Sequence, residues 1–144
     1  MTLLSRNSLL AKEKIEIVEV DLGKDDKGEP QSVFVRQMSG RERDVWGRSF
    51  VKEIKDNRGT VIGHDQAFED FRAKLAVVTV CNSEGMLILK PSDAPILSQN
   101  MSAATLEKIV NAAQRLNAIT EEDKEAIVKN SEADQVGNSS SDSA

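Results

Sequence analysis

Side chains able to act as nucleophiles or general bases are few in this chain of 144 residues. It has one histidine, His64, one cysteine, Cys81, and no tyrosine. His64 could act as a general base oriented by the neighbouring Asp65. No second residue of a catalytic type stands near this pair, so we expect an exposed loop histidine near a helix start. A small hydrolase dependent on His64 is kept as an alternative.

The same scarcity excludes sites that need several cysteines or histidines. A disulfide needs two cysteines, and zinc sites of this kind need three or four such ligands. Cys81 follows an apolar run, which favours a small buried side chain over a nucleophile. Gly59 and Gly63 are not followed by Lys-Ser or Lys-Thr, so a phosphate-binding P-loop is excluded. We therefore expect no cofactor, no metal and no enzymatic activity.

The charge balance bears on the kind of partner. There are 19 basic and 24 acidic residues, a net charge of −5, which argues against non-specific binding to DNA or to anionic membranes. Acidic residues interleave with a basic run, as in a solvated face with ion pairs. That run comprises Arg41, Arg43, Arg48, Lys52, Lys55 and Arg58. Arg6 and Asn7 interrupt the apolar start, so no signal peptide is expected, and no apolar stretch is long enough for a membrane helix.

An antiparallel β-hairpin is predicted near the start of the chain. Residues 14–22 alternate β-branched and acidic residues, as strands do, and a slip between Ile17 and Val18 predicts a bulge there. Turn-forming residues fill 23–30, and residues 32–36 form the second strand. A two-stranded hairpin is marginal in water, so we expect this one to pack on helices.

A capping box is the strongest local signal in the sequence. Ser39 and Glu42 have the S-x-x-E spacing that begins a helix. Apolar residues follow at helical spacing, which predicts a helix of about four turns ending near residues 57–59. They are Val45, Trp46, Phe50, Val51 and Ile54.

The remaining elements are predicted from apolar spacing and from helix caps. Phe68, Phe71, Leu75 and Val78 predict a helix from about Asp65 to about Val80, although residues 76–81 could instead be a strand. A short helix is expected over residues 3–11 and a turn over residues 82–85, and residues 86–89 would be an extended piece over the core. Further helices should follow Ser92, Ser102 and Thr120, the last with Ala126 and Ile127 as its apolar anchors.

The predicted fold class is therefore α+β, an N-terminal antiparallel hairpin packed on four to five helices. Residues 1–130 form one domain, and residues 131–144 form a flexible, disordered tail rich in serine and acidic residues. The stripe after Ser102 allows two interpretations: core packing, or a groove for a partner helix. Its candidate partner-binding residues are Leu106, Ile109, Val110 and Leu116.

The order of these motifs resembles the tail assembly chaperones of long-tailed bacteriophages. The Val-Arg strand that runs into a Ser-Gly-x-Glu-Arg-Asp helix start is similar to the family hallmark, and it comprises Val35, Arg36, Ser39, Gly40, Glu42, Arg43 and Asp44. Two leucine pairs at the start, the segments 71–77 and 82–85, and a penultimate helix ending in Leu116-Asn117 also resemble the family. The longer loop over residues 23–30 departs from the tight turn common there.

This resemblance implies a non-enzymatic role in the host bacterial cytoplasm. Such a protein would bind the phage tape measure protein, help to recruit the tail tube protein, and be absent from the mature virion. A frameshift-extended form of the same chain would be a further partner, whereas nucleic acid and membrane would not. A structural minor tail or tail completion protein that stays in the virion is the alternative.

Overall fold

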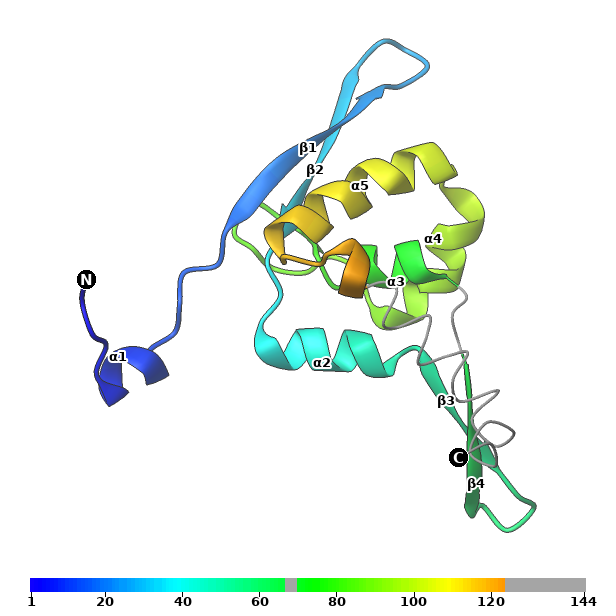
Figure 1. Ribbon diagram of the computed structural model, residues 1–144. Helices are drawn as coiled ribbons and strands as arrows, with labels where there is room; N and C mark the ends of the chain where they lie inside the picture. Colours follow the sequence, from blue (N-terminus) through cyan, green and yellow to red (C-terminus); the bar gives the residue numbers. More distant parts are fainter. Residues whose placement is uncertain (67–69, 124–144) are drawn as a thin grey trace.

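The computed structural model describes residues 1–66 and 70–123, and the structural statements below concern these residues. The fold is α+β, as predicted: an antiparallel hairpin packs on helices (Figure 1). The elements are α1 (Arg6–Leu10), β1 (Ile17–Lys24), β2 (Pro30–Arg36), α2 (Gly40–Arg48), β3 (Val51–Lys55), β4 (Val61–Gln66), α3 (Phe71–Val77), β5 (Val80–Cys81), η1 (Pro91–Asp93), α4 (Ala94–Asn100) and α5 (Ala103–Leu116).

The core forms between helix α5 and one face of a sheet with strand order β1-β2-β5. Val18 pairs with Val35 across β1 and β2, and alternation puts Val20 and Val33 on the same face, which packs against α5. Ser102 caps α5 by accepting from the amide of Thr105, so that helix begins where predicted. The apolar stripe of α5 fills the other side of this core.

The predicted bulge lies elsewhere in β1. The register shifts between Asp21 and Gly23, not between Ile17 and Val18. Gly23 has φ +96°, and its amide donates to the Asp21 carboxylate over 2.8 Å. The alternation needs no slip at Ile17 because a loop covers the outer face there: a Cβ added to Gly85 would lie 3.0 Å from Ile17 Cδ1.

Helix α2 is shorter than predicted. It ends at Arg48, and the residues expected to continue it form strand β3, which pairs with β4. Trp46 and Phe50 are buried, whereas Ile54 is 44% exposed on the strand. The Asp56 carboxylate accepts from the amides of Arg58 and Thr60, which closes a hairpin turn where a helix end was predicted.

Strand β4 also replaces the predicted start of the next helix. His64 lies opposite Glu53 in this hairpin, so it is not at a helix start, and α3 begins only at Phe71. The strand alternative holds for β5, which pairs with β2, and the turn over residues 82–85 is confirmed. Phe68 lies outside the described residues.

Of the two caps predicted at Ser92 and Thr120, one is wrong and one is confirmed. Ser92 was predicted to cap a helix, but it does not. Instead, the Asp93 carboxylate accepts from the amide of Lys90 at the start of η1. Thr120 caps as predicted, because its hydroxyl accepts from the amide of Asp123 over 3.1 Å. The predicted anchors of the last helix and the tail over residues 131–144 lie outside the described residues.

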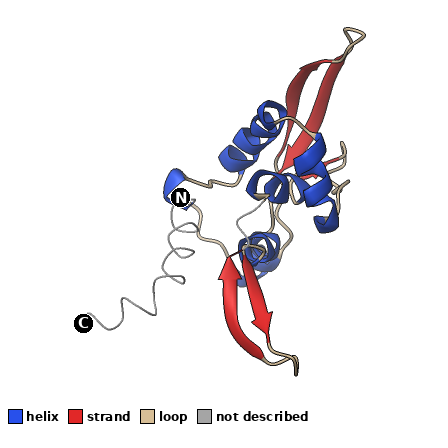
Figure 2. Ribbon diagram, turned by 90° about the vertical axis from the view of Figure 1, so that its right-hand side faces the viewer, coloured by secondary structure: helices blue, strands red, loops and turns tan. Residues whose placement is uncertain are grey.

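Three parts stand out from this body. The two hairpins project in opposite directions (Figure 2), and α1 stands apart on an extended segment (Figure 1). We call residues 1–11 the N-terminal arm. In the described part of the chain, no helix combines the length and apolar character needed to cross a membrane.

Truncating a core isoleucine should destabilise the chain far more than truncating an exposed one. Ile109 is 2% exposed on α5 and Ile96 is 58% exposed on α4. We expect Ile109→Ala to lower the free energy of unfolding by about 2–5 kcal/mol and Ile96→Ala by less than about 0.5 kcal/mol. Urea unfolding of both variants measures this, and equal losses would contradict the assignment of α5 to the core.

Candidate functional site

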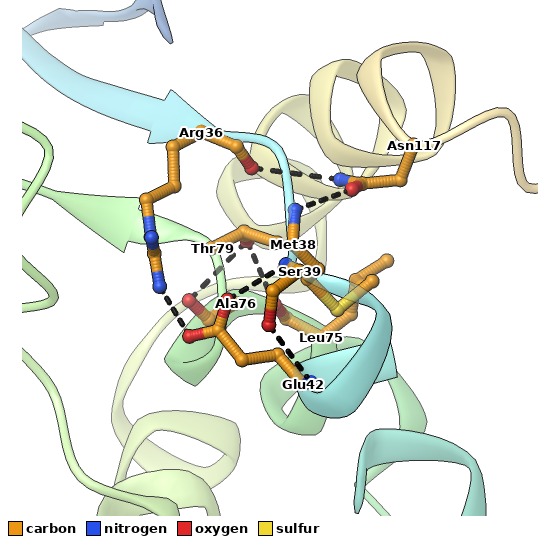
Figure 3. Close-up of polar contacts among 8 residues, drawn as sticks. All are labelled: Arg36, Met38, Ser39, Glu42, Leu75, Ala76, Thr79 and Asn117. Atoms are coloured by element: carbon orange, nitrogen blue, oxygen red, sulfur yellow. Dashed lines mark hydrogen bonds and ion pairs between the residues drawn. The ribbon is translucent and has the colours of Figure 1, made fainter. Parts of the chain in front are cut away.

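The motif that carries the family resemblance forms the junction between β2 and α2 (Figure 3). Ser39 Oγ accepts from the amide of Glu42 over 3.2 Å, and Glu42 Oε1 accepts from the amide of Ser39 over 2.8 Å, so the predicted capping box is present. The other carboxylate oxygen of Glu42 pairs with the Arg36 guanidinium. Arg36 is only 9% exposed, and this pair holds the end of the strand to the first turn of the helix.

Asn117, just past α5, joins this junction to the end of that helix. Its Oδ1 accepts from the amide of Met38 over 2.6 Å, while its Nδ2 donates to the carbonyl of Ala113 over 2.8 Å. Gln37 Nε2 donates to the carbonyl of Leu116 over 3.3 Å. The amide of Met38 and the carbonyl of Leu116, which lie beyond the strand ladder and at the end of the helix, thus gain side-chain partners.

Thr79 links the junction to α3. Its Oγ1 donates to the carbonyl of Leu75 over 2.7 Å at the end of that helix, and its own carbonyl accepts from the amide of Arg36 over 2.9 Å. Thr79 has no exposed surface. Strand β2 and helices α2, α3 and α5 therefore meet at one polar junction.

The other motif residues have mixed roles. Val35 is fully buried in the core. Arg43 Nη1 donates to the carbonyl of Asn117 over 2.8 Å, and its guanidinium lies over the Trp46 ring. Asp44 is exposed. Gly40 begins α2 with open space around its Cα, and nothing in the structure explains a glycine there.

The predicted partner-binding stripe belongs to the core. Leu106, Ile109 and Val110 are 4%, 2% and 1% exposed, and Leu116 is half-buried against the same cluster. The core interpretation therefore holds for the three buried residues, whereas Leu116 also lines an open groove between β1 and α5. A surface that binds a partner must instead consist of exposed residues.

The chemically reactive residues are not brought together. His64 is in β4 of the projecting hairpin, whereas Cys81 is in β5 of the sheet. Cys81 is 2% exposed, and burial raises the pKa of its thiol, opposed in part by the charge of Arg36. Among the described residues, no group of three or more histidine, cysteine or acidic side chains is placed to hold a metal ion.

Exposed apolar residues concentrate in the projecting parts. In the N-terminal arm, Leu3, Leu4, Leu9 and Leu10 are 92%, 62%, 68% and 67% exposed, and no residue of α1 is buried. The hairpin β3–β4 exposes Val51, Ile54, Val61 and Ile62. The two leucine pairs were visible in the sequence, but their exposure was not, because apolar spacing does not show which surface covers a side chain.

Open grooves flank the described part of the fold. One, of about 500 Å³, runs between β1 and α5, with Glu19 and Asp21 on one side and Lys108 and Arg115 on the other. The second, of about 660 Å³, lies beside α2 and is lined in part by Trp46. Both are open to solvent, unlike the enclosed pockets that bind small molecules.

Comparison of the chain with models of known protein families, with curated proteins and with solved structures gave no match.

Removing the Asn117 side chain should open the junction. Asn117→Ala leaves the amide of Met38 without its acceptor, and we expect the free energy of unfolding to fall by about 1–3 kcal/mol. Asn111→Ala is the matched control, because Asn111 is an exposed residue of the same helix. Chemical denaturation compares the two variants, and a loss of similar size in both would mean that Asn117 does not hold the junction.

The Cys81 thiol should react slowly while the chain is folded. Its pKa is raised by burial, so less thiolate is present at pH 8 than for an exposed cysteine, and the sulfur is covered. We expect labelling by a thiol-specific reagent at pH 8 to be about tenfold or more slower than for Ser8→Cys in the exposed arm. Denaturant should remove the difference, and equal folded-state rates would show that Cys81 is accessible.

Proposed function

We propose that this chain is a non-enzymatic tail assembly chaperone of a long-tailed bacteriophage, which binds the tape measure protein and promotes assembly of the tail tube around it. The family resemblance supports this proposal through the order of its motifs. The exposed leucines of the N-terminal arm are the single observation that carries it, since they offer apolar surface on a segment separate from the folded body.

The arm suits a long, helical and partly apolar client. Helix α1 has five residues, far fewer than the roughly 12–15 that an isolated helix needs to be stable in water. Packing against a client would stabilise it and would cover Leu9 and Leu10 as well as apolar surface of the client. Covering such surface is what keeps an unassembled chain from aggregating.

The polar junction fits this role as a scaffold. It fixes the sheet and the helices in one rigid body, while the apolar surface lies on parts that project from it. We infer that the tail tube protein and a frameshift-extended form of this chain are its further partners in the host cytoplasm, and that it leaves before the virion is complete. A virion protein of the minor tail or tail completion type is the alternative, and mass spectrometry of purified particles separates the two.

Coexpression with the tape measure protein tests the role of the arm. The double variant Leu9→Ser/Leu10→Ser should weaken binding by about tenfold or more, since two leucines lose their buried apolar contact. The soluble fraction of the tape measure protein, measured by sedimentation and blotting, should fall accordingly.

The control for this experiment is Ile88→Ser/Ile96→Ser, which removes two side chains that are each 58% exposed on the body. It should leave the soluble fraction unchanged. If the wild-type chain neither copurifies with the tape measure protein nor raises its solubility, the proposed function is wrong.

A further inference from the structure

The outer edge of β3 is a second apolar and charged surface. The sheet β3–β4 has two strands, so in the described part of the chain no strand pairs with this edge. The hairpin projects from the body (Figures 1 and 2), and such an isolated hairpin is marginally stable in water. Ile54 lies over Gly63, which has no side chain to cover it, and is 44% exposed. An edge of this kind is a template for another strand.

The geometry of a symmetric strand pair limits how two copies of β3 can meet. Two identical antiparallel strands are related by a twofold axis perpendicular to their sheet, so residues directly opposite each other must lie on the same face. Side chains alternate between faces, and therefore the numbers of two opposite residues must differ by an even number. Within β3, each allowed register is centred on one residue.

One of these registers is favourable. With the axis at Ile54, Ile54 meets its own copy, and Glu53 of each copy lies opposite Lys55 of the other. Both charged positions that flank Ile54 within the strand therefore meet an opposite charge. An axis at Lys52, Glu53 or Lys55 would bring identical charges together.

The edge of β1 has the opposite character. An axis at Glu19 or Asp21 would place identical acids together, and an axis at Val20 would place Glu19 opposite Asp21. Like charges directly opposite each other destabilise a strand pair, and charged edges are a common protection against such pairing. In these three registers the acidic residues of β1 oppose pairing, whereas the charges of β3 complement each other in one register.

We propose that two copies of this chain associate through their β3 edges, in an antiparallel four-stranded sheet of order β4-β3-β3-β4 with its twofold axis at Ile54. The interface joins the projecting hairpins and leaves the N-terminal arms outside the new sheet. It is independent of the proposed function and holds for any partner that the arm binds.

A cysteine at the axis tests the register. Opposite residues in such a pair have Cα atoms about 4.5–5.5 Å apart, within the range of a disulfide. In the full chain, Ile54→Cys should form a disulfide-linked dimer on mild oxidation, seen on a non-reducing gel. Ile62→Cys, on the neighbouring strand and more exposed than Ile54 (65% against 44% for the native residues), should not. Equal linking of both variants, or of neither, would overturn the register.

Charge reversal tests the pairs beside the axis. Glu53→Lys and Lys55→Glu each replace two attractive pairs by two repulsive ones, and each should raise the dimer dissociation constant about tenfold or more in sedimentation velocity. An equimolar mixture of the two variants restores every pair in the heterodimer, so it should associate as tightly as the wild-type chain.

Lys27→Glu and Glu29→Lys are the matched controls, because they make the same changes two residues apart in the exposed turn of the other hairpin. They should leave the dissociation constant unchanged, alone or mixed. A wild-type chain that stays monomeric up to its solubility limit would overturn the proposal, as would a mixture of Glu53→Lys and Lys55→Glu that associates no better than either variant alone.

Discussion

A buried positive charge at the end of β2 sets the arrangement of the body. The Arg36 guanidinium is nearly covered, and leaving a charge unpaired there would be strongly destabilising. Glu42 supplies the anion. The same carboxylate also completes the capping box, so the ion pair forms only when Ser39 is the N-cap of α2. The start of the helix and the direction of the strand are thus determined together. Asn117 and Thr79 then bring α5 and α3 to the same place, so the core forms around a polar junction.

The two hairpins differ in whether a helix packs against them. The hairpin β1–β2 rests on α5 and buries its valines, and its free edge carries acids that oppose pairing. The hairpin β3–β4 projects from the body and leaves apolar residues in water. A β-branched residue is therefore part of the core in one hairpin and part of a surface in the other, although the local sequences are similar. The difference is that α5 lies beneath the first hairpin, whereas the second projects from the body.

Local chemistry explains which features could be predicted. The fold class, the first hairpin, the capping box and the Ser102 cap depend on neighbours within a few residues, and the sequence predicted them correctly. The helix expected through Ile54 was wrong because Trp46, Phe50 and Ile54 fit a helical period, while the Asp56 turn that closes a hairpin was interpreted as a helix end. Only part of the polar junction could be predicted. Ser39 and Glu42 are local partners, but Asn117 lies 79 positions after Met38, and no spacing rule in the sequence connects these two residues. Exposure of the arm leucines depends on the whole fold.

The position of Asn117 also bears on how the chain emerges from the ribosome. Synthesis proceeds at about 5–20 residues per second, so roughly 4–16 s separate Met38 from Asn117, which accepts a hydrogen bond from its amide. Throughout that interval the valines of the first hairpin have no α5 to cover them. The nascent protein is therefore an open, apolar surface for most of its synthesis, and the body can close only when its last described helix has left the exit tunnel.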